Sequence, residues 1–342
     1  MPWFDAHLDL AMLAELGRDM EQDPSACGGP ELPAAVTFPS LAEGGVTHCL
    51  GTIFTEADGK PSEPHAYPAG DAEAANQAGL RQLKRYQDWD RPHHYRRLAA
   101  ASGEQPPPPD PRLSPNLLVL VEGADPILEP ADLGEWRERG VVAIGMAWWK
   151  PSRYAGGNGT DLGLTDLGRA LALEMDRLGV VHDASHLSDR AFWELSDRTD
   201  RPIIASHSNC RSLVGGGSRG ENQRHLHDDQ IREIVRRDGV IGINLFSRFL
   251  RPAADTDAPT RATIDDCVRH IEHVCRLAGD RAHVGLGSDM DGGFSAARLP
   301  EGIDRPRDLE RLAQALVLKG WTGAEVEGFR FTNWARFWGV GR

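Results

Sequence analysis

The sequence predicts a closed barrel of alternating strands and helices, the (β/α)₈ TIM-type fold of the α/β class. Short runs rich in Val, Ile and Leu alternate with longer amphipathic stretches, as in parallel strands joined by helices. About eight such units fit in the 342 residues, the number that closes this barrel. An open doubly wound sheet is the alternative. The first strand lacks the G-x-G-x-x-G turn that a dinucleotide-binding version of that sheet carries.

The expected strands are short, nearly continuous apolar runs, each preceded by Gly, Pro, Asn or a polar segment. They span residues 3–9, 46–54, 117–122, 141–148, 179–186, 202–207, 239–246 and 283–289. Helical periodicity is clearest over residues 166–179, 188–199 and 228–239. Ser188 is a good N-cap for the second of these helices.

The segment of residues 55–116 decorates the connection between the second and third strands. It contains a helix from about Asp71 to Ala101, followed by the stretch GEQPPPPDPRLSP, whose prolines exclude a helix or a central strand. The segment has few apolar residues that could form a core, so we expect residues 1–342 to form a single domain. The pattern of residues 308–339 at the C-terminus predicts two helices, with Thr322 and Glu325 in a capping box.

Composition excludes several classes of partner. The chain is 40% hydrophobic and 26% charged, typical of a soluble globular protein, and carries a formal net charge of −13. It has no run rich in Lys and Arg, so neither nucleic acid nor an anionic membrane is expected as a partner. No apolar run approaches the roughly 20 residues of a membrane span, and MPWFDAHLDL lacks the charged start of a signal peptide. A cytoplasmic protein is therefore expected.

Polar side chains with metal-ligand chemistry follow most of the expected strands. They are His7 and Asp9 at the first strand, Glu122 at the third, His186 at the fifth, His207 at the sixth, and Asp289 and Asp291 at the eighth. In a (β/α)₈ barrel the C-terminal ends of the strands form one rim, so we expect these side chains to converge. Imidazoles and carboxylates bind divalent metals, and this set could hold two ions with a bridging carboxylate.

Other histidines and the cysteines are not expected to bind a metal. His182 lies about one layer deeper than His186 and is expected to be a hydrogen-bonded core histidine. His270 and His273 lie three residues apart on an expected helix and are predicted to be a surface pair. The cysteines are odd in number and contain no C-x-x-C pair, which argues against disulfides and a Cys₄ zinc site.

With these motifs assembled, the sequence resembles the membrane (renal) dipeptidase family of zinc peptidases, the M19 group of the amidohydrolase superfamily. The motifs FDAHLDL, VEG, DASHLSD and ASHS are similar to the metal motifs of that family, in the same order. RHLHDDQI resembles its substrate-arginine segment, and HVGLGSDMDG followed by LPEGI is the most distinctive stretch. The family fold is a (β/α)₈ barrel.

The resemblance implies roles for individual residues. His7 and Asp9 would bind one zinc ion, His186 and His207 the other, and Glu122 would bridge both. Asp289 would be the acid/base beside a water that bridges the two metals.

Arg224 would hold the terminal carboxylate of the substrate, for which a guanidinium is well suited. The alternative for Arg224 is a surface ion pair with Asp228 or Asp229.

One position departs from the family pattern. The family usually has a histidine at the end of the fourth strand that helps to polarise the scissile carbonyl, and here the aligned residue is Trp148. Tryptophan can donate one N–H but cannot become a cation. Trp148 is therefore expected to line the substrate site and to alter its specificity.

The resemblance implies a zinc-dependent dipeptidase, in which a hydroxide bridging two metal ions would attack the amide carbonyl of a small dipeptide. The substitution at Trp148 motivates an alternative, a binuclear metal amidohydrolase acting on another small amide, a lactam or an N-acyl amino acid. A non-catalytic metal-binding scaffold is a third hypothesis, which the acid/base Asp289 disfavours. The resemblance also implies a possible homodimer.

Overall fold

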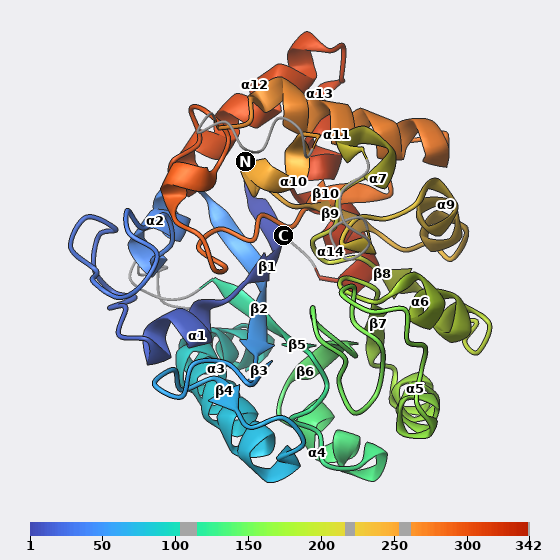
Figure 1. The fold of residues 1–342 in the computed structure, drawn as a ribbon. Coiled ribbons are helices and arrows are strands. Elements are labelled where there is room, and N and C mark those ends of the chain that lie inside the picture. The colour runs from blue at the N-terminus through green and yellow to red at the C-terminus, as the bar shows by residue number, and fades with distance from the viewer. Residues whose placement is uncertain (103–114, 216–222, 253–260, 341–342) are drawn as a thin grey trace.

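In a computed structural model of the protein, eight parallel strands form a nearly closed barrel surrounded by helices (Figure 1). The structure describes residues 1–102, 115–215, 223–252 and 261–340. The barrel strands are β1 (Trp3–Leu8), β2 (Val46–Phe54), β5 (Asn116–Glu122), β6 (Val141–Gly145), β7 (Val181–Asp183), β8 (Ile203–Ile204), β9 (Ile241–Ile243) and β10 (Val284–Leu286). Each predicted strand is present, and the predicted (β/α)₈ fold is confirmed.

The sheet runs in the order β8-β7-β6-β5-β2-β1-β10-β9. Its ends meet between β8 and β9, where Ala205 and Ile241 form an isolated parallel bridge. The amide of Ala205 donates to the carbonyl of Val240 at 3.1 Å, and the amide of Gly242 donates to the carbonyl of Ala205 at 2.8 Å. The strands are therefore arranged in a ring, and their C-terminal ends share one rim.

Helices cover the outside of this ring (Figure 1). They are α1 (Leu10–Glu15), α2 (Phe38–Glu43), α3 (Ala72–Ser102), α4 (Leu133–Glu138), α5 (Asp166–Leu178), α6 (Asp189–Ser196), α7 (Arg211–Val214), α9 (Asp228–Arg236), α10 (Ser247–Leu250), α11 (Ile264–Ala278), α12 (Leu309–Leu318), α13 (Gly323–Glu327) and α14 (Asn333–Trp338). Ser188 caps α6 by accepting from the amide of Ala191, as predicted.

The alternation of side chains along β5 explains why Glu122 points into the barrel. Val119 and Val121 pack outward in the large cluster between strands and helices, whereas Leu120 belongs to the cluster inside the barrel. Because side chains alternate along a strand, Glu122 points inward like Leu120, one layer nearer the rim. Phe331 and Trp334 belong to the same inner cluster as Leu120.

The decorated connection and the C-terminus follow the prediction in outline. After β2 come a pair of two-residue strands, β3 (Glu56–Ala57) and β4 (Ala66–Tyr67), and then α3. The proline-rich stretch falls on residues 103–115, of which all but the last lie outside the described residues. The predicted capping box of Thr322 and Glu325 is present. The second predicted C-terminal helix is instead α13, a five-residue π-helical segment (Gly328–Thr332) and α14.

Candidate metal centre

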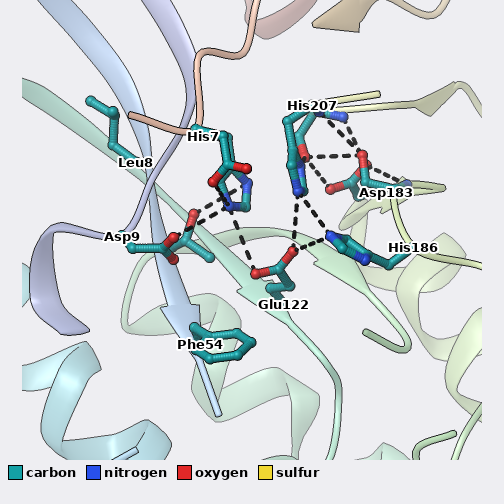
Figure 2. Close-up of polar contacts among 12 residues, drawn as sticks. His7, Leu8, Asp9, Phe54, Glu122, Asp183, His186 and His207 are labelled. Atoms are coloured by element: carbon teal, nitrogen blue, oxygen red, sulfur yellow. Dashed lines mark hydrogen bonds and ion pairs between the residues drawn. The ribbon is translucent and has the colours of Figure 1, made fainter. Parts of the chain in front are cut away.

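Six of the predicted polar residues meet at the rim of the barrel. They are His7 in β1, Asp9 directly after it, Glu122 at the end of β5, His186 after β7, His207 after β8, and Asp289 after β10. Each is 8% exposed or less. The imidazoles of His7, His186 and His207 point toward Glu122 (Figure 2). Their convergence is as expected from the strand ends; their role as metal ligands stays a prediction.

Glu122 lies between two groups of side chains. Its Oε2 atom is 3.7 Å from Nε2 of His7. Its Oε1 atom is 3.2 Å from Nε2 of His186 and 3.3 Å from Nε2 of His207, and these two nitrogens are 3.1 Å apart. One carboxylate therefore presents one oxygen to each group, as a carboxylate that bridges two ions must.

The group around His7 contains two further carboxylates. The Nε2 atom of His7 is 3.8 Å from Oδ2 of Asp9 and 3.9 Å from Oδ1 of Asp289. Ligand atoms of these three residues all lie within 4.8 Å of one another, and the same is true of His7, Glu122 and His207. The two groups are therefore close enough to form one binuclear centre.

The start of the chain reaches the centre differently from the prediction. The first strand was predicted to span residues 3–9, but β1 ends at Leu8, and its pairing with β2 is irregular between Asp5 and Leu8. Asp9 has φ −81° and ψ 44° and precedes α1. A shift of register rather than simple alternation brings both side chains inward.

The electrostatics of the cluster favour a bound cation. Burial disfavours a charged imidazole, yet the carboxylates of Glu122, Asp9 and Asp289 raise the pKa of His7 to about 10. Burial, with Asp9 adding to it, raises the pKa values of Glu122 and Asp289. The carboxylates of Glu122 and Asp289 resist ionisation because they have lost water and lie close to other negative charge. A divalent ion would relieve both effects.

Two further observations show that the donor set fits metal ions. Burial, with the positive charges of His7 and Arg224, lowers the pKa values of His186 and His207 well below their usual range, so both imidazoles are neutral and keep a lone pair. Oδ1 of Asp9 and Oε1 of Glu122 are buried and have no hydrogen-bond partner within the described residues. Buried polar atoms without a partner are uncommon and call for one.

A hydrogen-bond chain sets the tautomer of His207. The Oγ atom of Ser206 donates its only proton to Oδ2 of Asp183 at 2.5 Å, and it lies 2.8 Å from Nδ1 of His207. Since Ser206 has no second proton, Nδ1 of His207 must be the donor. The lone pair of His207 is thus on Nε2, the atom that faces Glu122.

Asn158 does the same for His186. Its Oδ1 atom accepts from Nδ1 of His186 at 2.8 Å, which leaves the lone pair on Nε2. Asp183, which also accepts from the amides of Ser185 and Ser206, and Asn158 were not predicted as site residues. Asp183 lies in the DASH motif beside His186 and could have been suspected, whereas the loop that carries Asn158 has no such signal.

Removing the hydroxyl of Ser206 is expected to weaken metal binding. Ser206→Ala leaves Nδ1 of His207 without its acceptor, so His207 is less well oriented and populates both tautomers. We expect a 10–100-fold loss of metal affinity, measured by competition with a chromophoric chelator. Ser196→Ala removes another buried serine hydroxyl, bonded to Glu233 on α9, and is the matched control. Equal affinities for the two variants would contradict the role of Ser206.

The backbone at the centre is unusual in conformation. His186 has φ 67° and Asp289 has φ 59°, both in the left-handed region that non-glycine residues rarely adopt. Such strain persists where the surroundings impose it, and it concentrates at functional sites. Gly292 lies close to the carboxylates of Asp289 and Asp9. A Cβ at this position would lie 2.0 Å from Oδ1 of Asp289 and 2.8 Å from Oδ2 of Asp9, so no larger residue fits.

Arg224 is buried beside the cluster, not on the surface. It is 4% exposed; its Nη1 donates to Oγ of Ser208 at 3.0 Å and its Nη2 to the carbonyl of His207 at 2.8 Å. Its Nε has no hydrogen-bond partner within the described ranges. The alternative of a surface ion pair for Arg224 is wrong: Asp228 pairs with His273, and Asp229 with Arg232 and His227.

A cavity of about 400 Å³ opens above the six residues. Arg224 and Trp148 both line it, together with Phe54 and Phe246. The rings of Trp148 and Phe54 meet edge to face at 5.0 Å between centroids, and the ring of Trp148 is 6.0 Å from that of His186. Trp148 therefore forms part of the wall next to a predicted metal ligand.

Other polar residues do not join the centre. Asp291, expected at the rim, is fully buried in an ion pair with Arg18 and accepts from the amides of Ala35 and Val36. The prediction of a core role for His182 is confirmed, since its Nε2 lies 2.8 Å from Oδ1 of Asp176.

The prediction of a surface pair on α11 is wrong. His270 is fully buried and its Nδ1 accepts from the amide of Cys210, while His273 is 9% exposed. All five cysteines are buried and free, in agreement with the absence of a disulfide pattern.

Comparison with known proteins gives one family. The sequence profile of the membrane dipeptidase family (Peptidase family M19) matches residues 1–340. An uncharacterised protein from the pqqA 5′ region of Klebsiella pneumoniae is 32% identical over 216 residues, 61% of this chain and 75% of that protein. An uncharacterised dipeptidase of Schizosaccharomyces pombe is 35% identical over 179 residues, 52% of this chain and 40% of that protein.

Solved structures share the fold. A metallopeptidase from Rhodobacter sphaeroides, liganded with a phosphinate mimic of the dipeptide L-Ala-D-Ala, superimposes with a TM-score of 0.77 at 23% identity, covering 98% of this chain and 97% of that one. A probable dipeptidase, PvdM, from Pseudomonas aeruginosa also gives a TM-score of 0.77, at 19% identity, covering 99% and 95%.

The barrel, the histidines and carboxylates at its mouth and the family match together define a metal-dependent hydrolase. The chain belongs to the membrane dipeptidase family, peptidase family M19. Among the helices of the described ranges, none is both long enough and apolar enough to cross a bilayer.

Proposed function

We propose that this protein is a zinc-dependent dipeptidase that hydrolyses the amide bond of small dipeptides. The observation that carries the proposal is the position of Glu122, whose two carboxylate oxygens face two separate groups of imidazoles and carboxylates in a buried centre. The matching family is that of membrane dipeptidase, and the relative from Schizosaccharomyces pombe is described as a dipeptidase, which supports the same activity.

Two divalent ions would be held by the chain's own residues. His7 and Asp9 would bind one ion, His186 and His207 the other, and Glu122 both. Zn²⁺ suits this mixture of imidazole and carboxylate, although Co²⁺, Mn²⁺ and Fe²⁺ bind the same ligand types. When bound, the ions would lower the pKa of a water and polarise the amide carbonyl.

Asp289 is the proposed acid and base. It lies at the edge of the His7 group, and its Oδ2 accepts from Nδ2 of Asn244 at 2.8 Å, which fixes the carboxylate. We propose that Oδ1 takes the proton of the attacking water and delivers it to the leaving amine nitrogen. The raised pKa of Asp289, caused mainly by burial, brings its proton affinity closer to that task.

Arg224 would bind the terminal carboxylate of the substrate. Its guanidinium is held by Ser208 and by the carbonyl of His207 and borders the cavity, so it is already desolvated and oriented. A charge-assisted pair with a carboxylate at this position would fix the dipeptide relative to the centre.

Arg224→Met is expected to lower kcat/KM for a dipeptide about 10–100-fold, because a charge-assisted hydrogen bond contributes about 1.5–3 kcal/mol. The same variant should act on the corresponding dipeptide amide, which has no carboxylate, almost as well as the wild type does. Steady-state kinetics on both substrates measure the difference. Arg232→Met, on the exposed face of α9, is the control. Equal losses on the two substrates would show that Arg224 does not bind the terminal carboxylate of the dipeptide.

A substrate panel tests the proposed function against its main competitor. Metal-loaded protein is offered dipeptides, dipeptide amides, N-acyl amino acids and lactams, and the same protein stripped by a chelator serves as blank. We expect metal-dependent hydrolysis of free dipeptides above all. Trp148, in place of the usual family histidine, motivates the competitor, and cleavage of the N-acyl or lactam compounds without cleavage of dipeptides would favour it.

Three expectations from the sequence remain proposals: residues 1–342 as one domain, a cytoplasmic location and a possible homodimer. They rest, respectively, on the scarcity of core-forming residues in 55–116, on the absence from the sequence of an apolar run long enough to span a membrane, and on the family resemblance.

A further inference from the structure

We propose that the mouth of the barrel holds two separate apolar subsites, one on each side of the candidate metal centre, and that the enzyme favours dipeptides in which both side chains are large and apolar. This inference rests on the proposed dipeptidase function and adds its substrate class. It follows from where the aromatic residues around the cavity lie in the barrel.

The first subsite is formed by Phe54 and Trp148. Phe54 ends β2 and pairs in register with Glu122 of β5, while Trp148 follows β6. Their rings lie at 73° with centroids 5.0 Å apart, and both line the cavity. Trp148 is half-buried, so its ring still has apolar surface to lose to a ligand.

The second subsite is formed by Phe246, Phe249 and Phe294. Phe246 and Phe249 lie at α10 after β9, and Phe294 follows β10. The rings of Phe246 and Phe294 stack at 4.4 Å with 16° between their planes, and those of Phe246 and Phe249 meet at 4.9 Å and 77°. All three line the same cavity. Phe246 and Phe249 are half-buried.

Barrel topology separates these two groups. The first comes from the segments that end β2 and β6, which flank β5, and the second from those that follow β9 and β10. Around the ring of strands, β1 lies between the groups on one side and β7 and β8 on the other. His7 lies in β1, and His186 and His207 follow β7 and β8. The two aromatic groups therefore face each other across the candidate centre.

Arg224 determines which end of a dipeptide meets which group. Its guanidinium carbon lies 5.1 Å from the centroid of the Phe249 ring, so a carboxylate bound there places the C-terminal residue beside the second subsite. The amide then lies over the centre and the N-terminal residue extends toward Phe54 and Trp148. A cavity of about 400 Å³ is large enough for this span, being within the usual range of small-molecule sites.

Four dipeptides test the two subsites separately: Ala-Ala, Phe-Ala, Ala-Phe and Phe-Phe. The ratio of kcat/KM for Phe-Ala to that for Ala-Ala reports the first subsite, and the ratio for Ala-Phe to Ala-Ala reports the second. We expect each ratio to be about 10–100, from the extra apolar area that a benzyl group buries. Ratios near one in the wild type would overturn the proposal.

Substitutions then test which subsite produces each ratio of kcat/KM. Trp148→Ala should reduce the Phe-Ala ratio about tenfold and leave the Ala-Phe ratio intact, and Phe246→Ala should do the reverse. Trp149→Ala is the matched control, because Trp149 is the adjacent tryptophan, is 42% exposed and is not among the residues that line the cavity. A change of the wrong ratio in either variant, or a change of either ratio in the control, would overturn the proposal.

The readout also separates failure of this inference from failure of the proposed function. A ratio within one preparation is independent of the fraction folded, and Trp148→Leu replaces Trp148→Ala if that protein does not fold. If no dipeptide is hydrolysed, the proposed function fails, and calorimetric Kd values of Asp289→Asn protein for the same four dipeptides decide the inference alone. Tenfold or greater selectivity in Kd would support the subsites, and equal Kd values would overturn them.

Discussion

Glu122→Gln is expected to lose at least one of two bound metal ions per chain and to lower kcat/KM at least about a thousandfold. Among the residues that the structure describes, Glu122 is the one carboxylate that lies near both halves of the cluster, with Oε2 toward His7 and Oε1 toward His186 and His207. Glutamine keeps the shape, but it removes the charge and replaces one acceptor oxygen with an NH₂ donor. Elemental analysis of dialysed protein, together with steady-state kinetics, measures both effects.

The control for Glu122 is another carboxylate of the same cavity. Glu63 lines the cavity and pairs with Lys60 at 3.0 Å, outside the six-residue cluster. Glu63→Gln should keep the metal content and most of the activity of the wild type. If Glu122→Gln also kept its metal and its activity, Glu122 would not be a bridging ligand, and the binuclear arrangement would be wrong.

Asp289→Asn is expected to lower kcat by a factor of 10²–10⁴ while metal content and KM change little. Asparagine is nearly isosteric with aspartate, and its Oδ1 can still accept from Asn244, so the position of the side chain is kept. What is lost is a group that can take and return a proton. A loss confined to kcat is the signature of an interaction made at the chemical step.

Asp291 provides the matched control for Asp289. It lies two residues further along and is also buried, but its partner is Arg18. Asp291→Asn breaks a buried ion pair and is expected to lower the free energy of unfolding by about 3–5 kcal/mol, with kcat per folded molecule retained. Loss of metal from Asp289→Asn, rather than loss of kcat alone, would make Asp289 a ligand and leave the acid/base role vacant.

Much of the fold could be predicted because the barrel depends on patterns that are local in sequence. Each barrel strand is an apolar run, and caps such as Ser188 and Thr322 mark helix starts. Strand lengths were less predictable: the run at 202–207 forms only the two-residue strand Ile203–Ile204 and an isolated bridge at Ala205. A strand ends where its ladder partners end, which depends on neighbours distant in sequence.

The site could be predicted to the extent that ligands follow strands. His186, His207 and Glu122 follow apolar runs, and a barrel brings such positions together. Asn158 and Asn244, which orient His186 and Asp289, act through contacts 28 and 45 residues away in sequence, and no local pattern reveals them. Asp291 lies in the same motif as Asp289, but its side chain pairs with Arg18 instead of joining the metal centre. The motif alone does not reveal this contact.

The most direct test of the binuclear dipeptidase proposal is a zinc titration of chelator-stripped protein, with hydrolysis of a free dipeptide as the readout. We expect no hydrolysis without metal and a rise that reaches its plateau when two zinc ions are bound per chain. Two bound ions with no hydrolysis of any dipeptide would contradict the proposed activity. Full activity with a single ion bound would contradict the bridging role of Glu122.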